Sequence, residues 1–226
     1  MMNDNHCFKD VKLFSTMTEQ EVARLARASR LFIVQKGEMA FMQGDPSDSI
    51  YFLKEGIIKI SRINADGRKL TIDLIRPGEF FGELCLAGER ERRTIAEAMT
   101  NSFCCEFDRD FIEDYMKRRP DIALALIKII GDRRLAMENL LEDMAFMDIS
   151  TRVISLLLKY AEKNIVNIPL THQEIADLTG STRVSVSRSI AKLRKQGMIE
   201  TSGDRIKLVS NELPCDCLPY SSNVIC

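Results

Sequence analysis

Hydrophobic and polar positions follow two different rhythms along this chain. From residue 31 to about residue 107, short apolar runs alternate with turns such as Asp66-Gly67 and Pro77-Gly78, which recur roughly every ten residues. This rhythm is typical of an antiparallel sandwich or barrel, because a strand needs only about five residues before the chain turns back. The strands that it predicts lie at residues 49–53, 57–62, 69–75, 94–98 and 103–107.

Outside that segment, the apolar residues repeat at helical spacing and predict helices at residues 9–30, 109–117, 121–147 and 151–164. In the third helix they step alternately by four and three positions, which is a heptad seam with one polar member. The seam consists of Leu126, Ile130, Arg133, Met137, Leu140, Met144 and Met147. We expect it to form a parallel contact between two copies of the helix. The alternative is that it packs only on the β-rich segment of its own chain.

Residues 171–197 predict two short helices, at about 171–178 and 182–196, joined by a tight turn. Thr171 and Glu174 have the spacing of a capping box, and Gly180 supplies the turn with a residue that lacks a Cβ. At about 100° per residue, the second helix has two distinct faces. Its apolar face is Val186, Ile190 and Leu193, and its opposite face is Arg183, Val184, Ser187 and Arg188.

Positive charge is concentrated in and after this second helix. Residues 198–201 and 205–209 predict a two-stranded wing, and residues 183–207 contain seven Lys and Arg against two acids, a surplus of five on a chain of net charge −1. A basic helix of this kind fits the major groove of double-stranded DNA; the alternative is a solvated surface helix. The predicted DNA-binding residues are Thr171, His172, Ser181, Thr182, Arg183, Val184, Ser185, Ser187, Arg188 and Lys192.

Composition narrows the class of protein. No apolar run approaches the roughly 20 residues of a membrane span. The N-terminus lacks the layout of a secretory signal. We therefore expect a cytoplasmic protein with no membrane partner.

Seven cysteines without a Cys-x-x-Cys pair predict reduced thiols and no metal site. No nucleophile–base arrangement is apparent, so we do not expect an enzyme.

Three motifs add to this order of elements. They are Phe81-Gly82-Glu83-Leu84 followed by Arg93-Thr94, the segment from Gly180 to Arg188, and Ala145-Phe146-Met147-Asp148. With them the chain resembles the cyclic-AMP receptor protein and fumarate–nitrate regulator (CRP/FNR) family of bacterial transcription regulators. The resemblance implies an α+β fold: an antiparallel β-sandwich of the cyclic-nucleotide-binding jelly-roll type (1–119), a long dimerisation helix (120–147) and a winged helix-turn-helix (148–226). It also implies a homodimer on palindromic DNA, with RNA polymerase as a further partner.

The first motif is similar to the family's phosphate-binding cassette. A glycine lets backbone amides approach an anion, while an arginine fork and a hydroxyl add donors. The resemblance implies that Gly82, Glu83, Leu84, Arg93 and Thr94 hold a small-molecule effector such as cyclic AMP. Met137 and Glu138 stand where the cyclic-AMP receptor protein presents a Thr-Ser pair to the adenine, so the identity of the effector stays open. The alternative is a vestigial cassette, with a signal arriving through the cysteines (redox or metal) or through another small anion.

The second motif is similar to the family's recognition helix, but Val184 stands where members often carry Glu. Valine accepts no hydrogen bond and can only contact a thymine methyl group. The pattern is closer to the cyanobacterial nitrogen-control branch of the family. We expect Arg188 to bind a guanine bidentately and Arg183 to bind a guanine or a phosphate. The predicted half-sites contain a GT or GTG core.

Overall fold

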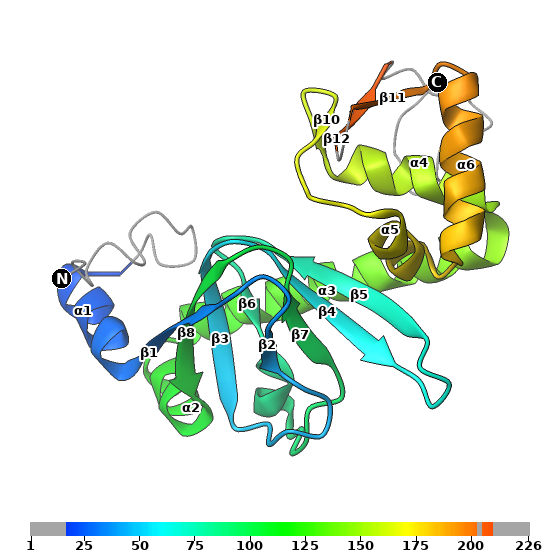
Figure 1. Ribbon diagram of the computed structural model, residues 1–226. Coiled ribbons are helices and arrows are strands. Elements are labelled where there is room, and N and C mark those ends of the chain that lie inside the picture. Colours follow the sequence, from blue (N-terminus) through cyan, green and yellow to red (C-terminus); the bar gives the residue numbers. More distant parts are fainter. Residues whose placement is uncertain (1–16, 203–204, 210–226) are drawn as a thin grey trace. The chain divides into compact units, whose positions relative to one another are not determined.

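The computed structural model describes residues 17–202 and 205–209, and the chain divides into two compact units (Figure 1). The division falls inside a 27-residue helix, α3 (Pro120–Phe146), between Asp132 and Arg133. Each unit has its own sheets, helices and core, and each is described separately below.

Two four-stranded antiparallel sheets form a sandwich in the first unit, in the strand orders β1-β8-β3-β6 and β2-β7-β4-β5. One core cluster draws residues from both sheets, including Val34, Leu53, Ile58, Ile75 and Ala96. The strands are β1 (Arg30–Val34), β2 (Met39–Phe41), β3 (Ser49–Glu55), β4 (Ile58–Ile63), β5 (Lys69–Ile75), β6 (Phe80–Phe81), β7 (Ile95–Ala98) and β8 (Ser102–Asp108).

All five predicted strands are confirmed to within two residues at each end. The sequence pattern missed β1, β2 and β6. Strands β2 and β6 are only three and two residues long, and β1 buries just its last residue, Val34, so none of them shows a clear alternation. The helix expected at residues 9–30 has its described part at α1 (Glu19–Ala28), because residue 30 already belongs to β1.

Three helices cover one face of the β1-β8-β3-β6 sheet. They are α1, α2 (Arg109–Arg118) and the start of α3, which bury Leu25, Ile112 and Ile122 against Phe52 and other residues of that sheet. The Arg119 side chain joins them: its guanidinium pairs with Glu21 of α1, and with Asp121 of α3 at 2.8 Å. Both ion pairs and apolar contacts therefore join the three helices on this side of the first unit.

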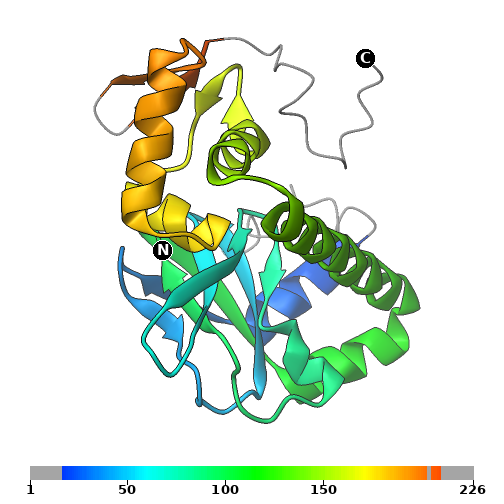
Figure 2. The same ribbon diagram turned by 90° about the vertical axis from the view of Figure 1, so that its right-hand side faces the viewer.

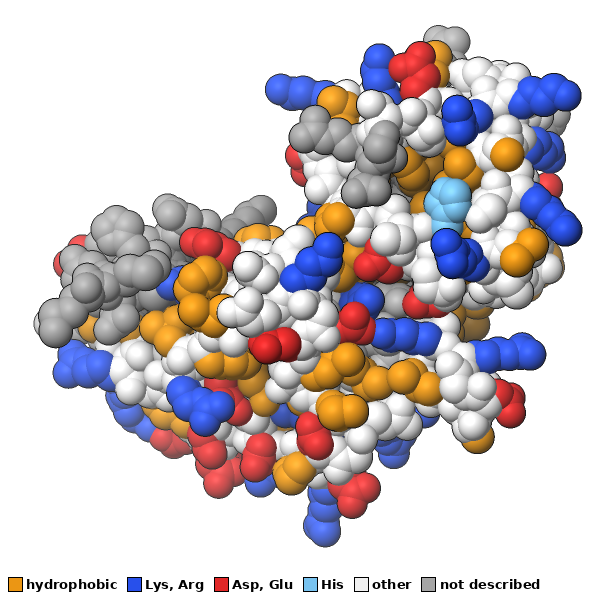
Figure 3. Space-filling model, viewed as in Figure 1, with side chains coloured by type: hydrophobic (Ala, Val, Ile, Leu, Met, Phe, Trp, Pro, Cys, Tyr) orange, Lys and Arg blue, Asp and Glu red, His pale blue; other side chains and the backbone are white. Residues whose placement is uncertain are grey.

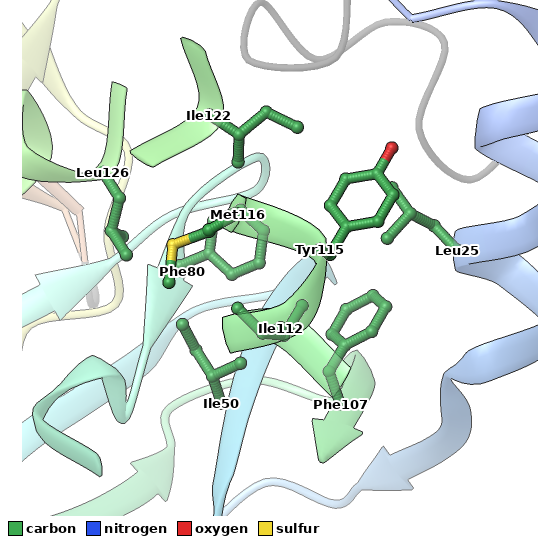
Figure 4. A pocket seen from close by; sticks show the side chains of 9 residues that line it. All are labelled: Leu25, Ile50, Phe80, Phe107, Ile112, Tyr115, Met116, Ile122 and Leu126. Carbon is green, nitrogen blue, oxygen red and sulfur yellow. The ribbon is translucent and has the colours of Figure 1, made fainter. Parts of the chain in front are cut away.

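An apolar cavity of about 30 Å³ lies beneath these helices (Figure 4). Its lining includes Leu126 and Ile122 of α3 and Tyr115 of α2, whose hydroxyl points away from the other labelled side chains. A volume of this size holds about one water molecule, so the cavity is too small for a nucleotide. Leu126 is 8% exposed here. The first position of the predicted heptad seam therefore packs within its own chain, which corrects the expectation of an intermolecular contact at Leu126.

The second unit contains a three-helix group beside a small sheet of order β11-β12-β10-β9 (Figure 2). Val153 and Leu157 of α4, Ile175 of α5 and Val186 of α6 have no exposed surface and form its core. The elements are α4 (Ile149–Lys159), β9 (Ala161–Glu162), β10 (Ile165–Val166), α5 (His172–Thr179), α6 (Arg183–Lys195), β11 (Ile199–Ser202) and β12 (Arg205–Leu208).

The helix predicted at residues 151–164 instead ends at Lys159. Lys163 and Asn164 form the two-residue turn between β9 and β10, and both have positive φ, at 50° and 66°. Positive φ at both positions is the geometry of a type I′ hairpin turn. The helical periodicity of the sequence did not reveal this hairpin.

The predicted turn at Gly180 is confirmed, with a left-handed φ of 60°. A Cβ at this position would overlap the terminal methyl group of Met144. We expect Gly180→Ala to lower the free energy of unfolding by about 1–3 kcal/mol, because a left-handed residue with a Cβ costs roughly 1–2 kcal/mol before any overlap is counted.

The free-energy cost of the overlap with Met144 can be measured separately from the cost of the left-handed backbone. In a Met144→Ala background, Gly180→Ala should cost only the backbone contribution, so the two substitutions should be non-additive in urea unfolding. Equal costs in both backgrounds would show that Met144 does not lie against the turn.

Candidate nucleic-acid interface and effector cassette

Helix α6 has one buried face and one exposed face, as its periodicity predicts. Val186, Ile190 and Leu193 are at most 4% exposed, whereas Val184 is 60% exposed. The Ser185 backbone N–H donates to Thr182 Oγ1 at 3.2 Å, so Thr182 caps the helix. Because the apolar face is buried, the helix cannot rotate about its axis without exposing core residues.

A groove of about 470 Å³ runs between α6, the start of α5 and the wing. Among its lining residues are His172 and Thr171 of α5, Arg183 and Arg194 of α6, and Thr201 of β11. None of the described residues that line it is acidic. Figure 3 shows the histidine side chain in pale blue with Lys and Arg side chains near it. The groove thus offers cationic and hydrogen-bonding groups to an anion such as a phosphate.

The structure brings the ten predicted DNA-binding residues together on α5, α6 and the turn between them. Three of their hydroxyls are already engaged at the turn and at the start of α6: that of Ser181 with Thr179 at 2.7 Å, and those of Thr182 and Ser185 with each other at 2.9 Å. The exposed members are Thr171, Thr182, Arg183, Val184, Arg188 and Lys192, and the half-buried members are His172, Ser181, Ser185 and Ser187. The exposed members therefore include the three cationic side chains of α6 and Val184.

Helix α4 forms hydrogen bonds with both α5 and α6, the two helices of the helix-turn-helix. The Arg152 guanidinium donates to the Thr179 carbonyl at 2.7 Å, in the last turn of α5, and the Ser150 hydroxyl donates to Ser189 of α6 at 3.3 Å. The sequence did not identify these residues, because nothing in helical spacing distinguishes them from solvated polar residues. A cation at the C-terminal end of α5 also matches the sign of the helix dipole there.

The segment before α4 is fixed by a helix cap. Asp148 accepts the Thr151 backbone N–H at 2.7 Å, and this hydrogen bond holds the pKa of the Asp148 carboxyl below its ordinary value. The end of α3 and the start of α4 are therefore separated by a defined cap rather than by a loose loop.

In the first unit, the cassette begins at Gly82, whose left-handed φ of 75° starts the short helix η3 (Glu83–Ala87). The arginine that reaches this turn is Arg92, which is 2% exposed and donates to the carbonyl oxygens of Gly82 at 2.9 Å and Ser49 at 2.5 Å. Its guanidinium also lies 4.5 Å from the ring centroid of Phe41. Arg92 thus connects the Gly82 turn to β3 and the aromatic core.

The predicted cassette arginine, Arg93, is placed differently. Its side chain is exposed, and its backbone N–H donates to Glu89 Oε1 at 3.3 Å. Thr94 and Glu83 are half-buried, and Leu84 is 44% exposed. The sequence shows an Arg-Arg pair but gives no signal for which of the two faces inward, so Arg92 was missed as the inward residue.

Met137 and Glu138, the predicted base-contacting residues, belong to the second unit, whereas the cassette belongs to the first. Met137 is 47% exposed, and Glu138 forms an ion pair with Arg134 one turn earlier at 2.9 Å. The role of these two residues in binding an effector stays a prediction.

Three cysteines lie in the described ranges, and all are buried. Burial raises the pKa of the Cys85 thiol to about 11 and that of Cys104 to about 12, so both are protonated near neutral pH and react slowly. The remaining four, Cys7, Cys215, Cys217 and Cys226, lie outside the described residues.

Residues 17–202 and 205–209 contain no cluster of three potential metal ligands. The helices of this part of the chain include none with the length and apolarity required to span a bilayer.

Comparison with known proteins gives matches in both units. Residues 31–119 match the family described as the cyclic nucleotide-binding domain, and residues 151–212 match the Crp-like helix-turn-helix domain. The global nitrogen regulator of Synechocystis is 33% identical over 76% of this chain and 80% of its own length. The CRP-like cAMP-activated global transcriptional regulator of Mycobacterium tuberculosis is 27% identical over 88% and 93%.

A solved CRP/FNR-family regulator from Thermus thermophilus has a TM-score of 0.62 at 27% identity, covering 80% of this chain and 94% of its own. These relatives are transcription regulators rather than enzymes. The matches confirm the predicted fold class, a cyclic-nucleotide-binding β-sandwich followed by a helix-turn-helix. The chain therefore belongs to the CRP/FNR family of transcription regulators.

Proposed function

We propose that this regulator binds palindromic DNA as a homodimer and that a small anionic effector controls its binding. The observation that carries the proposal is the exposed face of α6, where Arg183, Val184 and Arg188 point away from the core of the second unit. In a major groove, a guanidinium fork matches guanine O6 and N7, and a valine tip contacts a thymine methyl group. RNA polymerase as a further partner stays a prediction.

The two arginines at the start of α6 have different surroundings, which suggests different roles. Arg183 lines the groove with His172 and Arg194, where phosphate oxygens would be bound. Arg188 is exposed and does not line that groove, so we assign it to a base edge.

Substitution separates these roles. Arg188→Ala should lower affinity for the preferred palindrome by about 1–3 kcal/mol for each half-site and relax selection at one base pair of each half-site. Arg183→Ala should weaken all sequences alike and reduce the slope of log K against log salt concentration by about 0.9 for each protomer, about 1.8 for the dimer. The measurement is fluorescence anisotropy on a selected palindrome and on a scrambled duplex, over a salt series. If Arg188→Ala leaves the discrimination between the two duplexes intact, the assignment of Arg188 to a base is wrong.

The homodimer is supported by apolar side chains on α3 that are exposed in the described part of the chain. Ile127 is 63% exposed and Leu141 is 65% exposed. Others on the same helix are Leu124, Ile130, Leu135, Met137 and Phe146, each at least 41% exposed. Burying such side chains in a second copy would stabilise a pair of helices by about 1.5–3 kcal/mol for each large residue.

We expect Ile127→Asp to convert the dimer to a monomer, because a charge in an apolar helix contact lacks a partner. Ala136→Asp provides the matched control: Ala136 is also exposed but lies about 180° around the helix from Ile127. Sedimentation equilibrium should show a monomer for the first variant and a dimer for the second. A wild-type chain that sediments as a monomer would contradict the dimer directly.

For the effector, we propose a phosphate-bearing small molecule at Gly82, Arg93 and Thr94, with cyclic AMP as the first candidate. Support comes from the match of residues 31–119 to the cyclic nucleotide-binding domain and from the relative named as cAMP-activated. Gly82 also has a left-handed φ of 75°, a conformation that occurs in backbone turns that bind anions. Arg93 is exposed and so is free to turn toward a ligand.

Arg93→Ala should weaken effector binding by about 10- to 100-fold, the loss expected when a charge-assisted hydrogen bond is removed. Arg90→Ala, another exposed arginine of the same loop, should bind as the wild type does. The measurement is titration calorimetry with cyclic AMP, cyclic GMP and 2-oxoglutarate. Equal effector affinities for the Arg93→Ala and Arg90→Ala variants would show that Arg93 does not contact the anion.

A second candidate is the same DNA-binding role with a vestigial cassette. The observation that favours it is that the Arg92 guanidinium already donates hydrogen bonds to the carbonyl oxygens of Gly82 and Ser49. In that case none of the three ligands would bind, and control would come from another signal.

A further inference from the structure

A hydrogen bond joins the first residue of α5 to the middle of α6. His172 Nδ1 lies 2.9 Å from Ser187 Oγ. The two residues are fifteen positions apart, so a tertiary contact, rather than helix geometry, holds this hydroxyl. In the described part of the chain, the other ring nitrogen, Nε2, has no hydrogen-bond partner.

Ser187 differs from the two other serines of α6. The Ser185 hydroxyl is bonded to the cap residue Thr182, and Ser189 is buried and accepts from Ser150. Ser187 is half-buried and lines the groove, on the same side as Arg183 one turn earlier. Of these three serines, Ser187 is therefore the one placed to meet a ligand in the groove.

The direction of the hydrogen bond decides what Ser187 can recognise. A hydroxyl has one proton and two lone pairs, and a neutral imidazole has one donor and one acceptor nitrogen. If Nδ1 carries no proton, Ser187 must donate to it, and Oγ then only accepts, for example from the amine of adenine N6 or cytosine N4. If Nδ1 carries the proton, Ser187 accepts it and can donate to guanine or thymine instead.

The second ring nitrogen selects between these two states. A proton on one nitrogen of a neutral imidazole is fixed by the hydrogen bond that this nitrogen makes. The groove around His172 is lined by Arg183 and Arg194, which would attract a DNA phosphate. A phosphate oxygen beside Nε2 requires Nε2 to donate, and this leaves Nδ1 without a proton.

We propose that His172 is a positioning residue for base recognition, which makes Ser187 a hydrogen-bond acceptor for the exocyclic amine of an adenine or cytosine in each half-site. Nε2–H donates to the DNA backbone while Nδ1 accepts a hydrogen bond from the Ser187 hydroxyl, so a contact to the DNA backbone determines whether Ser187 can accept from a base. This inference rests on the proposed docking of α6 on DNA.

Binding-site selection with the full-length protein tests this inference. The full-length wild type should prefer adenine or cytosine at one position of each half-site. His172→Phe, which keeps a ring without an acceptor, and Ser187→Ala should each reduce that preference by about three- to tenfold, the effect of one hydrogen bond. Replacing the preferred adenine by purine, which lacks the amine, should weaken the wild type but not Ser187→Ala.

The double variant gives the readout that a purely structural role would not change. If His172 acts through Ser187, adding His172→Phe to Ser187→Ala should not alter the preference further. Asn167→Ala, a polar residue of the same unit that bonds Glu162, is the control and should keep the wild-type preference. His172→Gln serves as a second variant if His172→Phe does not fold by circular dichroism.

Three outcomes have distinct meanings. An unchanged preference in His172→Phe, or an equal loss of affinity on all sequences, overturns the role of His172 while leaving DNA recognition by α6 intact. Additive effects in the double variant also overturn it. A wild type without any sequence preference would instead remove the proposed function itself.

Discussion

The burial of one face of α6 is the constraint on which the nucleic-acid interface depends. Val186, Ile190 and Leu193 pack against α4 and α5, where Val153, Leu157 and Ile175 are also inaccessible. Rotating α6 about its axis would bring these residues into water, at a cost of about 1.5–3 kcal/mol for each large side chain. The orientation of every polar residue on α6 therefore follows from the packing of its apolar ones. The interface is rigid because it is the outer side of a core helix.

Local signals in the sequence predicted the elements that depend on local physics. The capping box of Thr171 and Glu174 and the left-handed turn at Gly180 are each formed within a few residues, and each is present. The strands between glycine turns were also predictable. Strands β1, β2 and β6 were not, because their few residues have no consistent buried face. The inward position of Arg92 and the His172–Ser187 contact depend on tertiary packing, which no periodicity encodes.

Helix α3 shows why a heptad pattern in the sequence does not predict which surface the helix packs against. Ile122 and Leu126 are buried with α1, α2 and the sheet, whereas Ile127 and Leu141 are exposed on the same helix. Apolar residues at a spacing of three and four serve both kinds of contact equally well. The distinction comes from what the rest of the chain covers, and only a fold can supply that information. The long helix thus packs on the first unit through Ile122 and Leu126 and still has exposed apolar side chains such as Ile127 and Leu141.

The contacts behind the helix-turn-helix limit how a signal can reach DNA. Arg152 holds the end of α5, Ser150 holds Ser189, and α4 shares its buried residues with α5 and α6. Shifting α6 relative to α4 would break the Ser150–Ser189 hydrogen bond, and shifting α5 relative to α4 would break the Arg152–Thr179 hydrogen bond. Either shift would also open the shared core, so α4, α5 and α6 form one packed group. An effector changes DNA binding only by favouring one arrangement of such groups over another, through a difference in its affinity for each. The packed group of α4, α5 and α6 begins at the capped start of α4, where Asp148 accepts the Thr151 backbone N–H.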